Sequence, residues 1–186
     1  MSFHFDHLDI PEVIRVTPTR HGDGRGFFSE TYRASVFEGA GIRDVFLQDN
    51  HARSSRGVLR GLHYQAPPRA QAKLVRVIQG EVFDVAVDLR VGSPTFGRWV
   101  GGVLSGDDGA TLYIPEGFAH GYQCLSEHSE LVYKVSSEFD AGLDGGIAWD
   151  DETAGIPWPL ANPSLSARDR SLPSLAESNS PFTYPL

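Results

Sequence analysis

Hydrophobic and polar residues alternate along two neighbouring segments near the middle of the chain, residues 57–65 and residues 73–80. The pair Pro67–Pro68 lies between them. A period of two is typical of a strand with one buried face, and paired prolines favour a turn. We therefore expect two strands that direct His63 and Lys73 into one cavity. A base and a fixed cation would then share a pocket.

The same alternation recurs along most of the chain and predicts an all-β fold. Strands are expected within residues 1–16, 27–32, 46–50, 82–90, 98–104, 111–114 and 131–135. Segments rich in Gly, Pro, Asn, Asp and Ser separate them, as turn residues do. Helical patterns are confined to residues 35–40 and 164–169. The second reads as a capped helical turn that holds Asp169 against the mouth of the cavity.

Residues 57–65 contain one conflict between pattern and function. Strict alternation places His63 on the face opposite Arg60, although both have the chemistry to contact an anionic ligand. Both reach the same cavity only if the strand bulges or twists between them. Gly61 is the expected position, because glycine tolerates the backbone conformation that a bulge needs.

Composition indicates an ordinary globular protein. The chain has 186 residues, 40% of them hydrophobic, which predicts a single domain over residues 1–186 with a loosely held tail at about 173–186. One cysteine, Cys124, rules out an intrachain disulfide and fits a reducing compartment. We find no apolar segment long enough to span a membrane and no secretory leader, so a cytoplasmic location is expected.

Charge is unevenly distributed along the chain. The net charge of −8 argues against nonspecific nucleic-acid binding, so no nucleic-acid partner and no membrane partner are expected. Residues 1–76 nevertheless contain 11 basic and 8 acidic side chains. A local positive field that attracts an anionic ligand could be formed by Arg25, Arg53, Arg56, Arg60, Lys73 and Arg76.

Three spacings match the two signatures of cupins, which are small β-barrels. They are Gly57-x5-His63, Lys73-x6-Gly80, and Gly109-x5-Pro115-x-Gly117-x2-His120. Metal-binding cupins have a second His where this chain has Gln65, and a Glu where it has Lys73. An ammonium group offers no lone pair and repels cations, so we expect no metal site. Asp84 is expected to orient His120, and Asp88 to be structural.

A wider set of motifs resembles the dTDP-4-dehydrorhamnose 3,5-epimerase family over about residues 5–172. In chain order they are Gly24-Arg25-Gly26-Phe27-Phe28-Ser29-Glu30, Gln48-Asp49-Asn50, Gly57-Val58-Leu59-Arg60-Gly61-Leu62-His63, Ile114-Pro115-Glu116-Gly117-Phe118-Ala119-His120, Tyr133, Trp149-Asp150-Asp151 and Leu165-Ser166-x2-Asp169. The resemblance implies a cupin-type double-stranded β-helix barrel, or jelly roll, with short peripheral helices. It also implies epimerisation of dTDP-4-dehydro-6-deoxy-D-glucose at carbons 3 and 5.

The same resemblance implies the site residues. The catalytic set would be His63 as base, Lys73 as oxyanion stabiliser, Tyr133 as acid, and Asp169, which would orient His63 and raise its basicity. The substrate-binding set would be Arg25, Phe28, Glu30, Gln48, Asp49, Asn50, Arg60, Lys73, His120, Phe139, Asp144 and Arg168. No cofactor is implied, and the chain has no glycine-rich dinucleotide fingerprint. A homodimer with exchanged N-terminal strands would place Arg25 and Glu30 in the neighbouring subunit's site.

Three positions depart from the family's pattern: Ala52 replaces Ser, Phe139 replaces Tyr, and Asp144 replaces Glu. Phe139 keeps a ring that could stack on thymine, and Asp144 is shorter by one methylene. Three alternatives remain open: a mono-epimerase acting at carbon 3 or carbon 5 only, a non-enzymatic cupin that binds a sugar nucleotide, and a metal-dependent cupin oxygenase or isomerase.

Overall fold

A computed structural model describes residues 2–185, in which thirteen strands and two short helices are found. One sheet has six strands in the order β1 (Phe3–His7), β2 (Ile14–Pro18), β10 (Thr111–Ile114), β7 (Lys73–Gln79), β12 (His128–Val135) and β5 (Gln48–Ser55). The other has five, β13 (Asp144–Gly146), β6 (Leu59–Gln65), β11 (Phe118–Cys124), β8 (Glu81–Asp88) and β9 (Trp99–Ser105). A separate hairpin pairs β3 (Arg20–Asp23) with β4 (Gly26–Ser29). The helices are α1 (Ala34–Gly39) and α2 (Ala167–Arg170).

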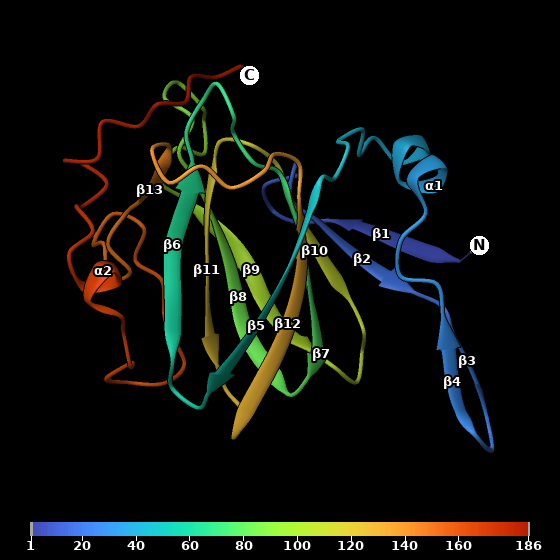
Figure 1. Cartoon of the computed structure of the whole chain (residues 1–186). Coiled ribbons are helices and arrows are strands. Elements are labelled where there is room, and N and C mark those ends of the chain that lie inside the picture. Colours follow the sequence, from blue (N-terminus) through green and yellow to red (C-terminus); the bar gives the residue numbers. More distant parts are fainter. Residues whose placement is uncertain (1, 186) are drawn as a thin grey trace.

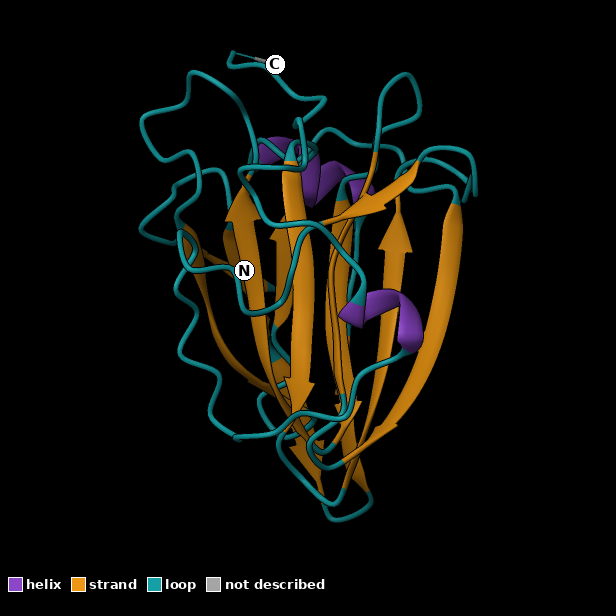
Figure 2. Cartoon of the chain, turned by 90° about the vertical axis from the view of Figure 1, so that its left-hand side faces the viewer, coloured by secondary structure: helices purple, strands orange, loops and turns teal. Residues whose placement is uncertain are grey.

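The two large sheets face each other and enclose the main core. It is built from inward-facing side chains of both sheets, including Val75, Ala86, Leu104 and Leu131. Figure 2 shows most strands running roughly parallel to one another, and Figure 1 shows α1 and α2 on opposite sides of the barrel. The expected all-β jelly roll with short peripheral helices is confirmed.

Each sheet also has a covered outer face. Phe37 of α1 and Ile42 pack on the six-stranded sheet against Val16 and Leu74. The outer face of the five-stranded sheet is covered by segments after β13, through Ile147, Ala154, Leu175 and Phe182. Within residues 2–185, neither helix is long and apolar enough to cross a membrane.

The prediction of a loosely held C-terminal tail is wrong. Leu175 and Phe182 are only 5% and 2% exposed, and the Phe182 ring meets that of Tyr64 at 5.4 Å. Thr183 also forms a β-bridge with Val91. A composition rich in Ser and Pro suggested a free segment, but two apolar side chains within it complete the core over β6 and β8.

The strand expected over residues 27–32 ends early, at Ser29. Beyond it, Glu30 forms an ion pair with Arg33 at 2.7 Å, and Tyr32 packs edge-on against Phe37. These contacts turn the chain towards α1. The β3–β4 hairpin that remains extends away from the barrel (Figure 1).

The bulge expected at Gly61 is confirmed. His63 pairs with His120 and Arg60 with Tyr122, so β6 has one residue more than β11 between the two pairs. Gly61 has a φ of +135°, and a Cβ there would lie 2.5 Å from the Cα of Gly121. The bulge lets β6 direct both Arg60 and His63 towards the space between the sheets.

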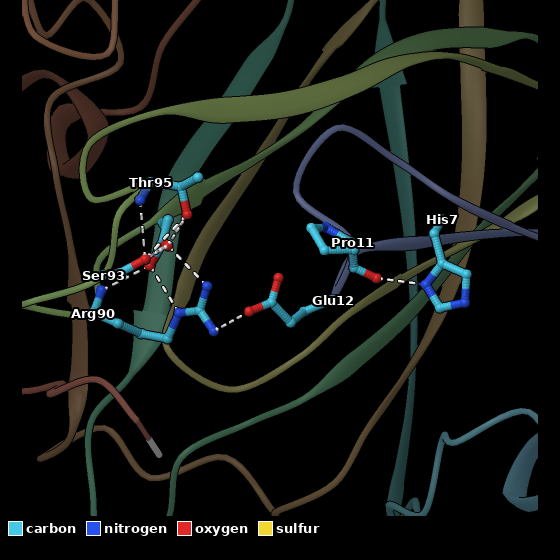
Figure 3. Close-up of polar contacts among 7 residues, drawn as sticks. His7, Pro11, Glu12, Arg90, Ser93 and Thr95 are labelled. Carbon is cyan, nitrogen blue, oxygen red and sulfur yellow. Dashed lines mark hydrogen bonds and ion pairs between the residues drawn. The ribbon is translucent and has the colours of Figure 1, made fainter.

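Asp88 is structural, as expected. It accepts hydrogen bonds from the Nε and Nη2 atoms of Arg90, at 2.9 and 2.8 Å, and from the hydroxyls of Ser93 and Thr95, both at 2.6 Å. Arg90 turns its remaining nitrogen to Glu12, 2.8 Å away, as Figure 3 shows. This buried cluster ties the end of β8 to the loop between β1 and β2.

Candidate active site

Two adjoining cavities open between the sheets. The larger, about 260 Å³, is named here the histidine cavity, and is lined by Ala52, Arg60, His63, Lys73, His120, Tyr122, Tyr133, Ser166, Arg168 and Asp169. The other, about 230 Å³, is named the amide cavity, and is lined by Gln48, Asn50, His63, Tyr64, Gln65, Gln71, Lys73, Tyr133, Phe139, Asp144 and Arg168. His63, Lys73, Tyr133 and Arg168 border both. The expectation that His63 and Lys73 share a pocket is confirmed.

His63 is held by Asp169, whose Oδ1 lies 2.6 Å from the His63 Nε2. Ser166 caps α2 by accepting a hydrogen bond from the Asp169 backbone, and its hydroxyl donates to Asp169 Oδ2 at 2.7 Å. The sequence therefore forms a short capped helix that fixes one carboxylate against one imidazole. An ionised Asp169 assigns the proton to Nε2, which leaves the other ring nitrogen with a free lone pair.

Burial affects the two partners differently. It lowers the pKa of His63 below 6.5, helped by the charges of Arg168 and Lys73, although Asp169 acts in the opposite direction. Burial alone would raise the pKa of Asp169, but hydrogen bonds from His63 and Ser166 lower it overall. Asp169 does raise the basicity of His63, as expected, but burial outweighs it. At neutral pH the pair is a neutral imidazole beside a carboxylate.

Lys73 begins β7 and is 7% exposed. Its ammonium donates to the backbone oxygen of His63 at 3.1 Å, so it does not reach out to solvent. Burial lowers its pKa to about 8, although Asp84 and Asp144 favour the charged form. At neutral pH the cavity thus contains a cation with few competing hydrogen bonds.

Tyr133 lies on β12 between Asn50 of β5 and Val75 of β7. Burial raises the pKa of its phenol, against the smaller effect of Arg60, so the phenol stays protonated at neutral pH. Among residues 2–185 its hydroxyl has no hydrogen-bond partner. A proton donor is therefore available at the wall between the two cavities.

His120 faces His63 across the β6–β11 pair. Its Nε2 lies 3.0 Å from Oδ2 of Asp84, which is fully buried, so the expectation that Asp84 orients His120 is confirmed. On the same strand, Tyr122 also lines the histidine cavity, and our sequence reasoning missed it. Its position two residues after His120 on a strand could have revealed it, because such residues share a face.

The amide cavity contains the groups expected to read a nucleobase. Gln48 donates to Asn50 at 2.8 Å and accepts from the backbone of Phe139 at 2.9 Å. The Phe139 ring is 58% exposed and has a face free for stacking. Asp144 forms an ion pair with Arg168 at 2.7 Å, which links β13 to α2. Gln65, Gln71 and Tyr64 line this cavity too, although they were not in the predicted set.

Four predicted binding residues lie outside both cavities. Arg25 and Phe28 are exposed on the β3–β4 hairpin, and Glu30 follows it. Asp49 points away from the cavities and pairs with Lys134 at 2.8 Å.

Of the basic residues expected to form a positive field, only Arg60 and Lys73 line the cavities, and Arg168 joins them. Arg53 lies near Glu130, Arg56 donates to the backbone of Leu125, and Arg76 lines a separate groove. The field at the cavities therefore comes from three side chains. The other basic side chains of the expected set point away from the two cavities.

The donor set suits a metal ion poorly. His63 and His120 each have one ring nitrogen against a carboxylate, and Lys73 places an ammonium group in the cavity that both histidines line. Within residues 2–185, no three side chains of His, Cys, Asp or Glu are grouped so that they could bind a metal.

Comparison with known proteins decides the family. The family model described as dTDP-4-dehydrorhamnose 3,5-epimerase matches residues 7–177. The chain belongs to the dTDP-4-dehydrorhamnose 3,5-epimerase family. Its members are isomerases, and one, the dTDP-4-dehydrorhamnose 3,5-epimerase of Shigella flexneri, is 53% identical over 162 residues, covering 87% of this chain and 90% of that protein.

Solved structures of the family agree with the barrel described above. The 3,5-epimerase of Legionella pneumophila, in complex with dTDP-4-keto-L-rhamnose, has a TM-score of 0.91 and 44% identity, covering 94% of both chains. A 3′-monoepimerase from Streptomyces bikiniensis, in complex with dTDP-quinovose, has a TM-score of 0.85 and 36% identity, covering 91% of this chain and 86% of that one. The fold is thus common to enzymes that act at one and at two carbons.

Proposed function

We propose that the protein epimerises dTDP-4-dehydro-6-deoxy-D-glucose at carbons 3 and 5 and forms dTDP-4-dehydro-L-rhamnose for nucleotide-sugar biosynthesis. The observation that carries this proposal is the 2.6 Å contact of His63 with Asp169 in a cavity that Lys73 and Tyr133 also line. Close relatives with the 3,5-epimerase name support it. A cytoplasmic location belongs to the same proposal.

Carbons 3 and 5 both flank the ketone at carbon 4, so their protons are acidified by the same carbonyl. The free nitrogen of His63 takes one of these protons, and the electron pair of the C–H bond moves onto the ketone oxygen. The ammonium of Lys73 stabilises the resulting enolate. Its buried position strengthens that interaction, because little water screens it.

Inversion requires that a proton return to the opposite face of the carbon. The phenol of Tyr133 is protonated, has no hydrogen-bond partner within the described part of the chain, and borders the same cavity as His63. It donates its proton to the carbon while the ketone re-forms. Solvent then restores the proton to Tyr133 and removes the one on His63, so the cycle needs no oxidant or reductant.

Five further predicted residues bind the nucleotide. Phe139, Gln48 and Asn50 offer a ring face and amide edges at the amide cavity, suited to thymine and ribose. Arg60 and Arg168 offer guanidinium groups for the diphosphate. The sugar then occupies the histidine cavity, next to His63 and Lys73.

We further propose that two copies pair through their N-terminal hairpins, so that Arg25, Phe28 and Glu30 of one chain reach the cavities of the other. The hairpin projects from its own barrel (Figure 1), and Phe27 and Phe28 are 62% and 74% exposed. Adjacent exposed phenylalanines are typical of a surface that another molecule covers.

Deuterium uptake tests the activity. The protein is incubated with dTDP-4-dehydro-6-deoxy-D-glucose in heavy water, and label is located by mass spectrometry and NMR, with His63→Ala as control. Label and inversion at both carbons support the proposal. Label at one carbon would indicate a mono-epimerase, and binding without any label would indicate a sugar-nucleotide-binding protein.

A further inference from the structure

Three polar side chains form a hydrogen-bond chain, and two of them, Arg60 and Tyr122, line the histidine cavity. The Arg60 Nε lies 3.1 Å from the hydroxyl oxygen of Ser54, which in turn lies 3.1 Å from the hydroxyl of Tyr122. Ser54 and Tyr122 are each only 4% exposed. Ser54 lies on β5, Arg60 on β6 and Tyr122 on β11. The hydrogen-bond chain therefore connects the two sheets.

The direction of these hydrogen bonds follows from counting donors. The guanidinium can only donate, so the oxygen of Ser54 accepts from Arg60. Among residues 2–185 the only acceptor within reach of the Ser54 hydroxyl hydrogen is the oxygen of Tyr122. A buried hydroxyl that does not donate is costly. Ser54 borders neither site cavity, whereas Tyr122 lines one, which favours donation from Ser54 to Tyr122. The hydrogen of Tyr122 is then left without an acceptor among the residues that the structure describes, 2–185.

Tyr122 lines the histidine cavity, so a molecule bound in that cavity can accept its unused hydrogen. The positive charge of Arg60 polarises Ser54, and Ser54 in turn polarises Tyr122, because hydrogen bonds in series strengthen one another. Burial raises the pKa of Tyr122, so the phenol remains a donor at neutral pH.

We infer that Tyr122 contacts the substrate and donates a hydrogen bond to an oxygen of its sugar ring, with Ser54 and Arg60 fixing the direction of that donation. The inference rests on the proposed function, since it requires that the sugar occupy the histidine cavity. Tyr122 lines that cavity and not the amide cavity, so the nucleotide part of the ligand lies out of its reach.

Tyr122→Phe tests this contact by removing one oxygen. Loss of one neutral hydrogen bond should lower kcat/KM for the dTDP-keto sugar by about fivefold to tenfold, while the Kd for dTDP alone stays within about twofold. Tyr113→Phe is the matched control. Tyr113 is also buried and bonded through its hydroxyl, to Asp44 at 2.7 Å, but it lines neither site cavity. This variant should keep wild-type kcat/KM.

Ser54→Ala tests the direction of the hydrogen bonds in this chain of side chains. With Ser54 absent, nothing fixes the Tyr122 hydroxyl, so adding Tyr122→Phe should cost clearly less than it does in the wild-type background. Equal costs in the two backgrounds, wild-type kcat/KM in Tyr122→Phe, or an equal loss of dTDP affinity would each overturn the inference. Failure of the proposed function looks different, because the wild-type protein itself would then show no deuterium uptake, or uptake at one carbon only.

Discussion

Asp169 and His63 are 106 positions apart in the sequence, yet their side chains lie 2.6 Å from each other. The contact exists because α2 packs beside β6, and because Ser166 caps α2 so that Asp169 faces the strand. The carboxylate decides which ring nitrogen of His63 carries a proton. It thereby decides which nitrogen can act as the base.

Asp169→Asn should therefore lower turnover by at least about 100-fold, although the side chain keeps its shape. An amide offers the imidazole either a hydrogen or a lone pair and does not enforce one tautomer. The rate of deuterium uptake measures the effect, with the exposed Asp150→Asn as control. Uptake within about twofold of wild type would show that the carboxylate is not needed.

The pH profile of kcat/KM should be bell-shaped, with its alkaline limb near pH 8. His63 acts as a base only when neutral, and burial lowers its pKa, so activity should rise with pH through a value below 6.5. Lys73 stabilises an enolate only when protonated, so activity should fall as pH rises through about 8. Lys73→Arg should lose the alkaline limb, because guanidinium stays charged.

Lys134→Ala is the matched control for that profile, because Lys134 is the only other lysine in the chain. It should keep both limbs. An alkaline limb that persists in Lys73→Arg would assign that pKa to another group.

Tyr133→Phe should separate proton removal from inversion. His63 and Lys73 remain, so deuterium should still enter the substrate, but no acid is left on the opposite face to complete inversion. NMR of the recovered sugar should show label with unchanged configuration. Inverted product formed at more than about one hundredth of the wild-type rate would exclude Tyr133 as the acid.

Alternation along the strands was sufficient to predict an all-β fold and the meeting of His63 with Lys73, whereas the jelly-roll topology followed from the resemblance to the family. Alternation predicts this meeting because side chains on a strand point to alternate faces. His63 and Lys73 lie on faces that point between the sheets, so both reach the cavity there. The bulge at Gly61 was also predictable, since Arg60 and His63 could not otherwise share a site.

Partnerships formed through loops were harder to foresee from the sequence. The ion pair of Asp144 with Arg168 and the packing of Phe182 on Tyr64 depend on where chain segments cross the barrel. The periodicity of hydrophobic residues within one segment does not predict where that segment crosses another. The hydrogen-bond chain through Ser54 needs three strands in register, which the sequence of any one strand does not specify.

Gly61→Ala should destabilise the protein and impair the site together. A Cβ at Gly61 would lie 2.5 Å from Gly121 and 2.9 Å from the backbone oxygen of His120, and φ is +135°. Strain and overpacking should lower the free energy of unfolding by about 2 to 5 kcal/mol, as measured by urea titration. The control is Gly102→Ala, where a Cβ meets no atom within 4 Å. Equal stability of the two variants would show that the bulge tolerates a side chain.

Combining two impaired variants in one pair tests whether hairpins are exchanged between copies. The test pair consists of one Arg25→Ala chain and one His63→Ala chain. If Arg25 contributes to the partner's cavity, this pair contains one intact site. That site combines the wild-type cavity of the Arg25→Ala chain with the wild-type hairpin of the His63→Ala chain. Loss of a charged hydrogen bond should make Arg25→Ala alone about 10- to 100-fold slower. Co-expressed chains, purified through tags on both, should then recover about half of the wild-type turnover per pair. If each hairpin serves its own barrel, the mixed pair contains no intact site, and its turnover will not exceed that of the Arg25→Ala protein.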